Sequence, residues 1–228
     1  AKKCTDEVVV IDSGSTDRTV ELAKEHGAKV AFRAWTNDFS AQRNFALEQT
    51  DADWVLYLDA DERLNENVIA EVKRIVASGV MDAQYAFTRK SGAFGKIFSY
   101  GVLYPDQVCR LFPRKAVVWV NKVHEHPECK LPEKHLSGYV THYTYKDWYE
   151  WEGKLCLYTT IWAEDAYKKG KRTTMAGIFQ HSVGAFFKMF VLRRGFLDGG
   201  LGIYLCFAHG FYTMLKYLKL YDLQNKRK

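Results

Sequence analysis

Two aspartates stand where a short apolar run of the chain ends. The run, residues 54–58, has the length and the β-branched and aromatic composition of a buried strand, and Asp59 and Asp61 follow it. Two positions apart in an extended segment, the two carboxylates face the same way. A hard divalent cation, Mg2+ or Mn2+, would relieve their repulsion and typically binds one or two carboxylates together with substrate phosphates. The pattern favours a cation site, although a solvated turn before the next helix would look the same.

A third aspartate, Asp12, also stands at the end of a predicted strand, residues 7–11, with Ser13 after it. The carboxyl ends of parallel strands share one edge of a sheet, so Asp12 is expected on the same edge as Asp59. Alternatively, Asp12 caps the helix that follows. Arg43 lies beside the apolar face of a helix predicted over residues 39–49. It could bind a phosphate, pair with an acid, or be an ordinary surface arginine.

The segment 120–127 reads Val-Asn-Lys-Val-His-Glu-His-Pro. On an extended backbone His124 and His126 share one face, and Glu125 lies on the other. The spacing suits a pair of metal ligands or a base with polar neighbours. It does not match the H-E-x-x-H zinc motif, which places its histidines four residues apart on a helix. A polar strand end is the alternative interpretation.

These side chains need a sheet that brings strand ends together. Residues 7–32 read as strand, helix and strand, a βαβ unit with a right-handed crossover. An amphipathic helix is predicted over residues 66–77, and residues 92–101 read as a mobile loop. Short strands, which indicate an antiparallel or mixed region added to the parallel sheet, are predicted over residues 84–89, 108–112, 117–120 and 139–143. From residue 148 the chain reads as helical and aromatic.

Charge is distributed unevenly along the chain. The net charge is +6, but residues 166–228 alone carry 12 Lys and Arg against 2 Asp and Glu. The longest uncharged run there, residues 199–215, is slightly short for a membrane span. We therefore expect amphipathic helices that lie on an anionic membrane surface or pack on the rest of the protein. The aromatic residues expected to enter the membrane are Phe186, Phe187, Phe190 and Phe196.

Composition excludes several classes of protein. The 228 residues, 47% of them hydrophobic, suffice for one large domain or for one domain with an appendage. The five cysteines are odd in number and far apart, which is typical of free thiols in a reducing compartment. No C-x-x-C occurs, so neither a zinc ribbon nor a redox motif is indicated. The basic end has no nucleic-acid-binding motif, so no nucleic-acid partner is expected.

Three motifs occur together in the first third of the chain. They are Val-Val-Val-Ile-Asp-Ser-Gly-Ser-Thr-Asp (8–17), Ala-Gln-Arg-Asn-Phe-Ala (41–46) and Leu-Asp-Ala-Asp-Glu (58–62). At these separations they resemble the family 2 glycosyltransferases with the GT-A fold. Lys-Val-His-Glu-His (122–126) and Gly-Phe-Leu-Asp-Gly-Gly-Leu-Gly (195–202) are similar to the bacterial branch known as lipopolysaccharide core β-1,4-glucosyltransferases.

The resemblance implies an α/β fold with a mostly parallel sheet and helices on both faces. It implies a catalytic domain over residues 1–145 and a helical, basic, aromatic-rich extension over residues 146–228. Family members begin with a further strand and helix that bind the nucleotide, so this chain is expected to start after them, truncated at its N-terminus.

The resemblance also implies roles for the donor side of the site. Asp12 resembles the acid that contacts the uracil or ribose, and Ser13 stands where most members have a second aspartate. Arg43 resembles the arginine near the nucleotide. Asp59 resembles the first acid of the Asp-x-Asp motif, which faces the ribose and the metal, and Asp61 resembles the direct metal ligand.

On the acceptor side, Glu125 falls where this branch places its catalytic base, with His124 or His126 as a substitute or a third metal ligand. The loop 91–104 is expected to close over the donor. The implied reaction is inverting transfer of a sugar, glucose in this branch. The donor is a UDP-linked sugar and the acceptor a glycan or a lipid-linked lipopolysaccharide core. The enzyme would lie on the cytoplasmic face of the bacterial plasma membrane. The alternatives are a nucleotidyltransferase of similar fold and an inactive nucleotide-sugar-binding module.

Overall fold

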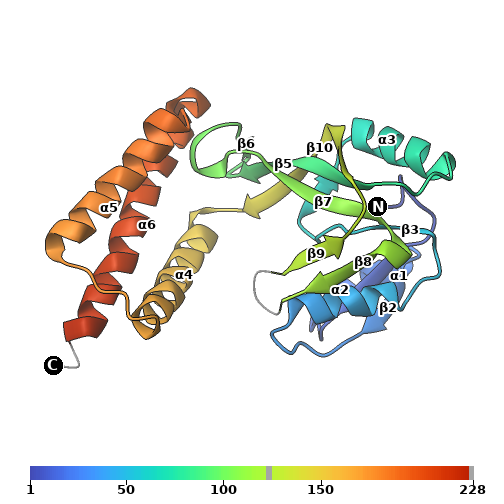
Figure 1. The fold of residues 1–228 in the computed structure, drawn as a ribbon, viewed down its shortest axis with the longest axis horizontal. Coiled ribbons are helices and arrows are strands. Elements are labelled where there is room, and N and C mark those ends of the chain that lie inside the picture. Colours follow the sequence, from blue (N-terminus) through green and yellow to red (C-terminus); the bar gives the residue numbers. More distant parts are fainter. Residues whose placement is uncertain (122–124, 226–228) are drawn as a thin grey trace. The chain divides into compact units, whose positions relative to one another are not determined.

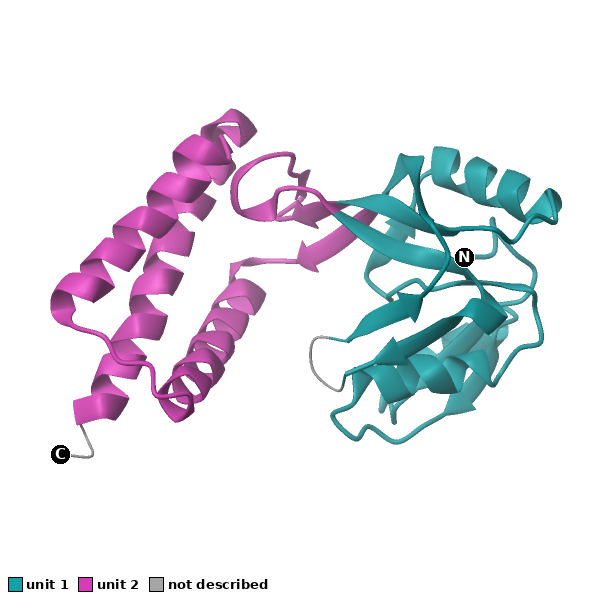
Figure 2. Cartoon of the chain, in the orientation of Figure 1, with its two compact units in different colours: residues 1–89, 107–140 teal, residues 90–106, 141–228 magenta. Residues whose placement is uncertain are grey.

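The computed structural model describes residues 1–121 and 125–225. The chain forms two compact units (Figure 2): residues 1–89 and 107–140 make the first, and residues 90–106 and 141–228 make the second. Each unit is therefore assembled from two separate stretches of sequence. The sequence predicts one boundary at residue 145, with residues 90–106 inside the catalytic domain, whereas these residues group here with the second unit. The predicted division into a catalytic domain and an extension stays a prediction.

The first unit begins with the expected βαβ arrangement. Strand β1 (Val9–Asp12), helix α1 (Thr19–Glu25) and strand β2 (Lys29–Phe32) follow one another, and the two strands pair in parallel with Asp12 opposite Phe32. Helix α2 (Phe39–Leu47) comes next. Its first turn is capped by the Asp38 side chain, which accepts a hydrogen bond from the Ala41 amide.

The main sheet has the strand order β3-β7-β5-β10-β4, with β6 paired to β5 at the side. Its strands are β3 (Trp54–Leu56), β4 (Glu62–Leu64), β5 (Gln84–Ala93), β6 (Lys96–Ile97), β7 (Asp106–Pro113) and β10 (Glu133–Tyr145). β3 pairs antiparallel with β7, and β5 pairs antiparallel with β6. The sheet is thus more mixed than the mostly parallel arrangement expected, and both antiparallel pairs include a strand of the region predicted to be antiparallel or mixed.

Helices cover both faces of this sheet. Successive side chains of β3 point to opposite faces and are all apolar, so both faces must be covered. On one face Trp54, Leu56 and Leu58 pack with Val68 and Val72 of α3 (Glu66–Ala77). On the other face a second cluster joins Val55 and Tyr57 of the strand region to Leu47 of α2, Phe112 of β7 and Trp119 of β8. Figure 1 shows α3 and α2 on either side of β7. A strand buried on both faces explains why residues 54–58 are apolar without interruption.

A short antiparallel hairpin completes the first unit. Its strands are β8 (Val117–Val120), which follows the 3-10 turn η2 (Arg114–Ala116), and β9 (His126–Cys129). Val120 pairs with His126, so Glu125 directly precedes the second strand.

The second unit is mostly helical (Figure 1). Helix α4 (Trp148–Lys168) is capped by Asp147, and α5 (Met175–Phe187) is capped by Thr174. The π-helical turn η3 (Lys188–Leu192) and the 3-10 turn η4 (Gly195–Asp198) lead into α6 (Gly199–Asn225). Helix α6 packs on both α4 and α5. Within residues 1–121 and 125–225 one stretch, Met175–Leu192, is long and apolar enough by composition to cross a membrane. It precedes residues 199–215, the uncharged run that the sequence predicts to be slightly short for a span.

Residues 91–104 form a defined hairpin where the glycine-rich sequence predicted a mobile loop. Strand β5 continues to Ala93, β6 turns back, and the 3-10 turn η1 (Gly101–Leu103) follows. The carboxylate of Asp198, only 6% exposed, accepts hydrogen bonds from the amides of Ser99 (3.1 Å) and Tyr100 (2.7 Å). At Gly101, whose φ is +62°, a Cβ would lie 2.9 Å from the Gly195 Cα, so the two backbones touch. These contacts with residues distant in sequence order the segment.

Candidate active site

The acid cluster after β3 is a tight turn that closes on itself. The Asp59 amide donates to Glu62 Oε2 (3.0 Å), and the Glu62 amide donates to the Asp59 carbonyl oxygen (2.9 Å). The Arg63 guanidinium donates to the Ala60 carbonyl oxygen and secures the same turn. Asp61 lies between these contacts with an exposed side chain. Glu62 and Asp61 therefore have different roles. Glu62 is only 2% exposed and supports the turn, whereas the Asp61 side chain faces solvent.

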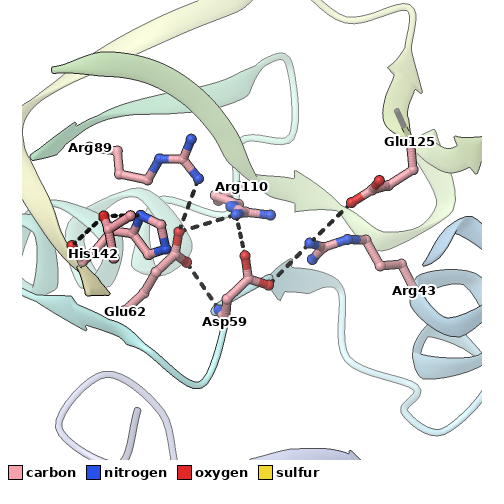
Figure 3. Close-up of polar contacts among 8 residues, drawn as sticks. Arg43, Asp59, Glu62, Arg89, Arg110, Glu125 and His142 are labelled. Atoms are coloured by element: carbon pink, nitrogen blue, oxygen red, sulfur yellow. Dashed lines mark hydrogen bonds and ion pairs between the residues drawn. The ribbon is translucent and has the colours of Figure 1, made fainter. Parts of the chain in front are cut away.

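Asp59 is held between two arginines (Figure 3). Its Oδ1 lies 3.1 Å from Arg43 Nη2, and its Oδ2 lies 2.7 Å from Arg110 Nη2. Burial by itself raises the pKa of this carboxyl, but the charges of Arg110 and Arg43 outweigh burial and leave the pKa below its ordinary value. Asp59 is therefore a carboxylate at neutral pH, and its charge is already balanced by the protein.

Arg110 and Glu62 are the deepest charges in this network. Arg110, 6% exposed on β7, reaches Glu62 Oε1 at 3.1 Å as well as Asp59. Arg89 Nη1 lies 3.8 Å from the same Glu62 oxygen (Figure 3). Neither arginine stands out in the sequence, since Arg110 is a lone cation in β7 and Arg89 is followed by Lys90 in β5. The alternation of β7, which puts Arg110 between apolar neighbours, was the available signal.

Three consecutive residues of α2 connect four separate segments. Gln42 Nε2 donates to Ser13 Oγ (2.8 Å), and its Oε1 accepts from Arg33 at the end of β2 (2.9 Å). Arg43 reaches Asp59. Asn44 accepts from the Trp119 amide (2.9 Å) and donates to the Trp119 carbonyl oxygen (2.8 Å). Successive helical side chains point about 100° apart, so three neighbours can serve different partners. The Ala-Gln-Arg-Asn-Phe-Ala motif thus connects the loop after β1, the end of β2, the acid turn and β8.

Arg43 also links the acid turn to the hairpin. Its Nη2 lies 3.6 Å from Glu125 Oε1 (Figure 3), and its guanidinium lies 4.6 Å from the centre of the Trp119 ring. Its Nε is buried and has no hydrogen-bond partner among the described residues. Arg43 therefore connects the acid turn to the hairpin through two ion pairs.

The histidines near Glu125 make a weaker connection. His126 is exposed, and its Nδ1 lies 3.4 Å from Asn121 Nδ2 within the hairpin. No contact of His126 with the acid turn is recorded among the described residues. His124 lies outside the described residues, so its role as a base or metal ligand stays a prediction.

Asp12 is fixed by its own loop. Its carboxylate accepts from the amides of Gly14 (2.8 Å) and Ser15 (3.2 Å), and the side chain is largely buried. A hydrogen bond from the Ser15 side chain, and after it the one from the Gly14 amide, holds the pKa of Asp12 below its ordinary value. Asp12 does not cap α1, because that helix begins at Thr19 and its N-cap is Arg18. Ser13, tied to α2 through Gln42, stands beside Asp12 at the end of β1.

The fit of a divalent cation can be judged from these carboxylates. Within residues 1–121 and 125–225, no three His, Cys, Asp or Glu side chains gather as metal ligands. Both Asp59 oxygens face guanidinium groups, whereas Asp61 presents an exposed carboxylate. This arrangement fits a cation that binds together with a diphosphate, with Asp61 as the protein ligand. It does not fit a cage formed by the protein alone.

Comparison with known proteins gives a consistent assignment. An uncharacterized glycosyltransferase of Rickettsia typhi is 28% identical over 99% of this chain and 81% of its own length. Glycosyltransferase SunS of Bacillus phage SPbeta is 36% identical over 31% of this chain and 18% of its own length.

Among solved structures, residues 1–349 of TarS from S. aureus align with 97% of this chain and 82% of that chain, at 13% identity and a TM-score of 0.42. The sequence model described as glycosyl transferase family 2 matches residues 2–118, which contain β1, α2 and the acid turn. The chain belongs to glycosyl transferase family 2, and its α/β structure is of the GT-A type.

Proposed function

We propose that this glycosyltransferase moves a sugar, glucose in the branch it resembles, from a UDP-linked donor to a hydroxyl group of a glycan or lipid-linked lipopolysaccharide core, with inversion. The observation that carries the proposal is the ion-pair chain Asp59–Arg43–Glu125, which joins the proposed donor side to the proposed base through one guanidinium. A single residue of α2 thus links the places where a leaving group and an acceptor would be handled.

In this mechanism the donor binds across the end of β1 and the acid turn. Asp12, kept ionised by hydrogen bonds from the Ser15 side chain and the Gly14 amide, would accept hydrogen bonds from the uracil or ribose, with Ser13 beside it. Asp59 would face the ribose while Arg110 and Arg43 hold it in place. The polar groups are fixed before the donor arrives, so little reorganisation is needed on binding.

Departure of the nucleoside diphosphate needs positive charge. Arg43, whose charge lies between the acid turn and the hairpin, would donate from its guanidinium to a phosphate oxygen. A Mg2+ or Mn2+ ion bound by Asp61 and the diphosphate would supply further neutralisation as a Lewis acid. On the acceptor side, Glu125 would take the proton of the attacking hydroxyl, for which its carboxylate must come within hydrogen-bond reach. Inversion follows from a single in-line displacement.

The five free thiols support a reducing compartment and thus the cytoplasm as the site of action. The donor pool of nucleotide sugars would be available there.

The test is to incubate the protein with a panel of nucleotide sugars and measure the nucleotide product. A sugar transferase releases UDP from one donor, whereas release of pyrophosphate would support the nucleotidyltransferase alternative. Glu125→Gln should lower turnover by about 10²–10⁴-fold with donor affinity unchanged, because the amide oxygen still faces Arg43 while the proton acceptor is lost. Glu128→Gln, an exposed glutamate on the same hairpin, is the matched control and should leave turnover unchanged. Near wild-type turnover in Glu125→Gln would assign the base to another group.

A further inference from the structure

Helix α5 and the turn after it present an apolar stripe to solvent. Large apolar residues recur at every fourth position and lie next to one another along the helix surface. They are Met175, Phe179, Val183, Phe187 and Val191, all exposed. Phe179 is 70% exposed and Phe187 56%, so most of each ring faces water. The stripe runs from residue 175 to residue 191, which is about 24 Å of helix.

Further apolar side chains continue the stripe. Leu192, Phe196 and Leu197 are exposed just after it in the chain. On α6, Phe207 is exposed, and its ring centre lies 4.7 Å from that of Phe186, which joins the two helices. Soluble monomers rarely expose a contiguous apolar surface of this extent, and such surfaces mark protein–protein or membrane interaction sites.

The charges around the stripe indicate which partner it fits. Arg172 precedes α5, and Lys188, Arg193 and Arg194 are exposed near its other end. One of the two acids of residues 166–228, Asp198, is buried and turned toward the amides of Ser99 and Tyr100. An apolar face with cations at both ends complements a bilayer that carries anionic headgroups.

We propose that the apolar stripe of α5 and η3 docks into the interface of an anionic lipid bilayer, with Arg172, Lys188, Arg193 and Arg194 at the headgroups. The sequence expected Phe186, Phe187, Phe190 and Phe196 to enter the membrane. Two of these have another role, because Phe186 and Phe190 stack on each other at 5.2 Å and are only partly exposed. The aromatic residues that enter are Phe179, Phe187 and Phe196, together with the aliphatic members of the stripe.

The stripe lies in one leaflet and does not cross the bilayer, although Met175–Leu192 is long enough. The opposite side of α5 is occupied, since Ile178 is buried in a cluster with Tyr217 of α6 and Ala163 of α4. Helix α4 carries charged side chains, among them the exposed ion pair Lys169–Asp165 at its end. Immersing α5 on all sides would take these charges into hydrocarbon, which is costly. The docking does not depend on the proposed sugar transfer.

The experiment is co-sedimentation with phosphatidylcholine vesicles that contain or lack phosphatidylglycerol, at low and at high salt. The wild type should bind the anionic vesicles and bind less at high salt, while the apolar part of the interaction survives. Phe179→Gln and Phe187→Gln should each weaken binding roughly tenfold, from the apolar area no longer buried. Lys188→Gln with Arg193→Gln should weaken binding at low salt and reduce its salt dependence.

Matched controls lie elsewhere on the chain. Leu157→Gln and Ile161→Gln change α4 side chains that are 56% and 52% exposed, and Lys24→Gln with Lys73→Gln removes two exposed cations of the first unit. All should bind like the wild type, and circular dichroism should show every variant folded. The proposal is overturned if the stripe variants bind as the wild type does, or if only detergent releases the protein. It is equally overturned if the stripe holds a dimer that ignores vesicles.

Discussion

Arg110→Met should destabilise the first unit strongly, because it leaves the buried carboxylate of Glu62 without its main cationic partner. Glu62 is 2% exposed, and Arg110 Nη2 is its nearest recorded cation at 3.1 Å. Removing one partner of a buried pair typically costs about 3–5 kcal/mol, most of it the penalty of the charge left behind. Arg89 remains at 3.8 Å and the Asp59 amide still donates to Glu62. We therefore expect the lower end, about 3 kcal/mol.

The second carboxylate that Arg110 contacts adds little to this figure. The Asp59 side chain is 37% exposed and keeps Arg43, so solvent screens most of its loss. For a chain of this size, about 3 kcal/mol corresponds to a fall of roughly 6–12 °C in Tm. The assay is urea unfolding followed by tryptophan fluorescence and by circular dichroism.

Two further variants decide the cause. Glu62→Leu combined with Arg110→Met should recover most of the loss, since an apolar pair of similar volume removes the stranded charge. Arg114→Met is the control, because Arg114 pairs at 3.6 Å with the fully exposed Asp51 and should cost below about 1 kcal/mol. The reasoning is refuted if Arg110→Met stays within about 0.5 kcal/mol of the wild type, or if the double variant is less stable than Arg110→Met alone.

Three other outcomes are expected. Asp61→Ala should abolish Mn2+-dependent nucleotide binding in calorimetry without lowering Tm, because Asp61 is exposed; unchanged binding would exclude it as the ligand. Asn44→Ala should cost about 1–3 kcal/mol and lower turnover more than donor affinity, because the buried Trp119 backbone loses both partners and the hairpin with Glu125 shifts; an unchanged turnover would contradict this. Asp59 has a lowered pKa, so its contribution to stability is present above the ordinary value of 3.8 and is lost as pH falls below it. Asp59→Asn should flatten the dependence of unfolding free energy on pH in that window, and an unaltered slope would assign the dependence to other carboxyls.

The sequence anticipated the elements whose periodicity is local. The βαβ start, α3 at residues 66–77 and the strand before Asp59 depend on neighbouring residues, and the structure confirms them. For Arg43 the sequence left three alternatives open, a phosphate ligand, an acid partner or an ordinary surface arginine, and the structure shows an acid partner, Asp59.

What the sequence did not predict depends on partners far apart in the chain. Arg110 and Glu62 are 48 residues apart, and Asn44 and Trp119 are 75 apart, so no local pattern reveals either pairing. The glycines within residues 91–104 predict a loop, because glycine makes the backbone flexible wherever no contacts from the rest of the chain restrain it. The contacts that restrain this segment come from residues distant in the sequence. Its order comes from Asp198, 99 positions after Ser99.

The Asp198 carboxylate is synthesised later than the amides that it binds, which delays the ordering of the hairpin during translation. The amides of Ser99 and Tyr100 are synthesised long before Asp198, and ribosomes add about 5–20 residues each second. For roughly 5–20 seconds, therefore, the hairpin exists without the acceptor that orders it. A nascent chain stopped before η4 would keep these donors unpaired and would leave Phe98, which is buried beside Leu205 of α6, exposed to water. Such intermediates are those that chaperones and proteases recognise, so yield in the cell should depend on how quickly the last quarter of the chain is completed.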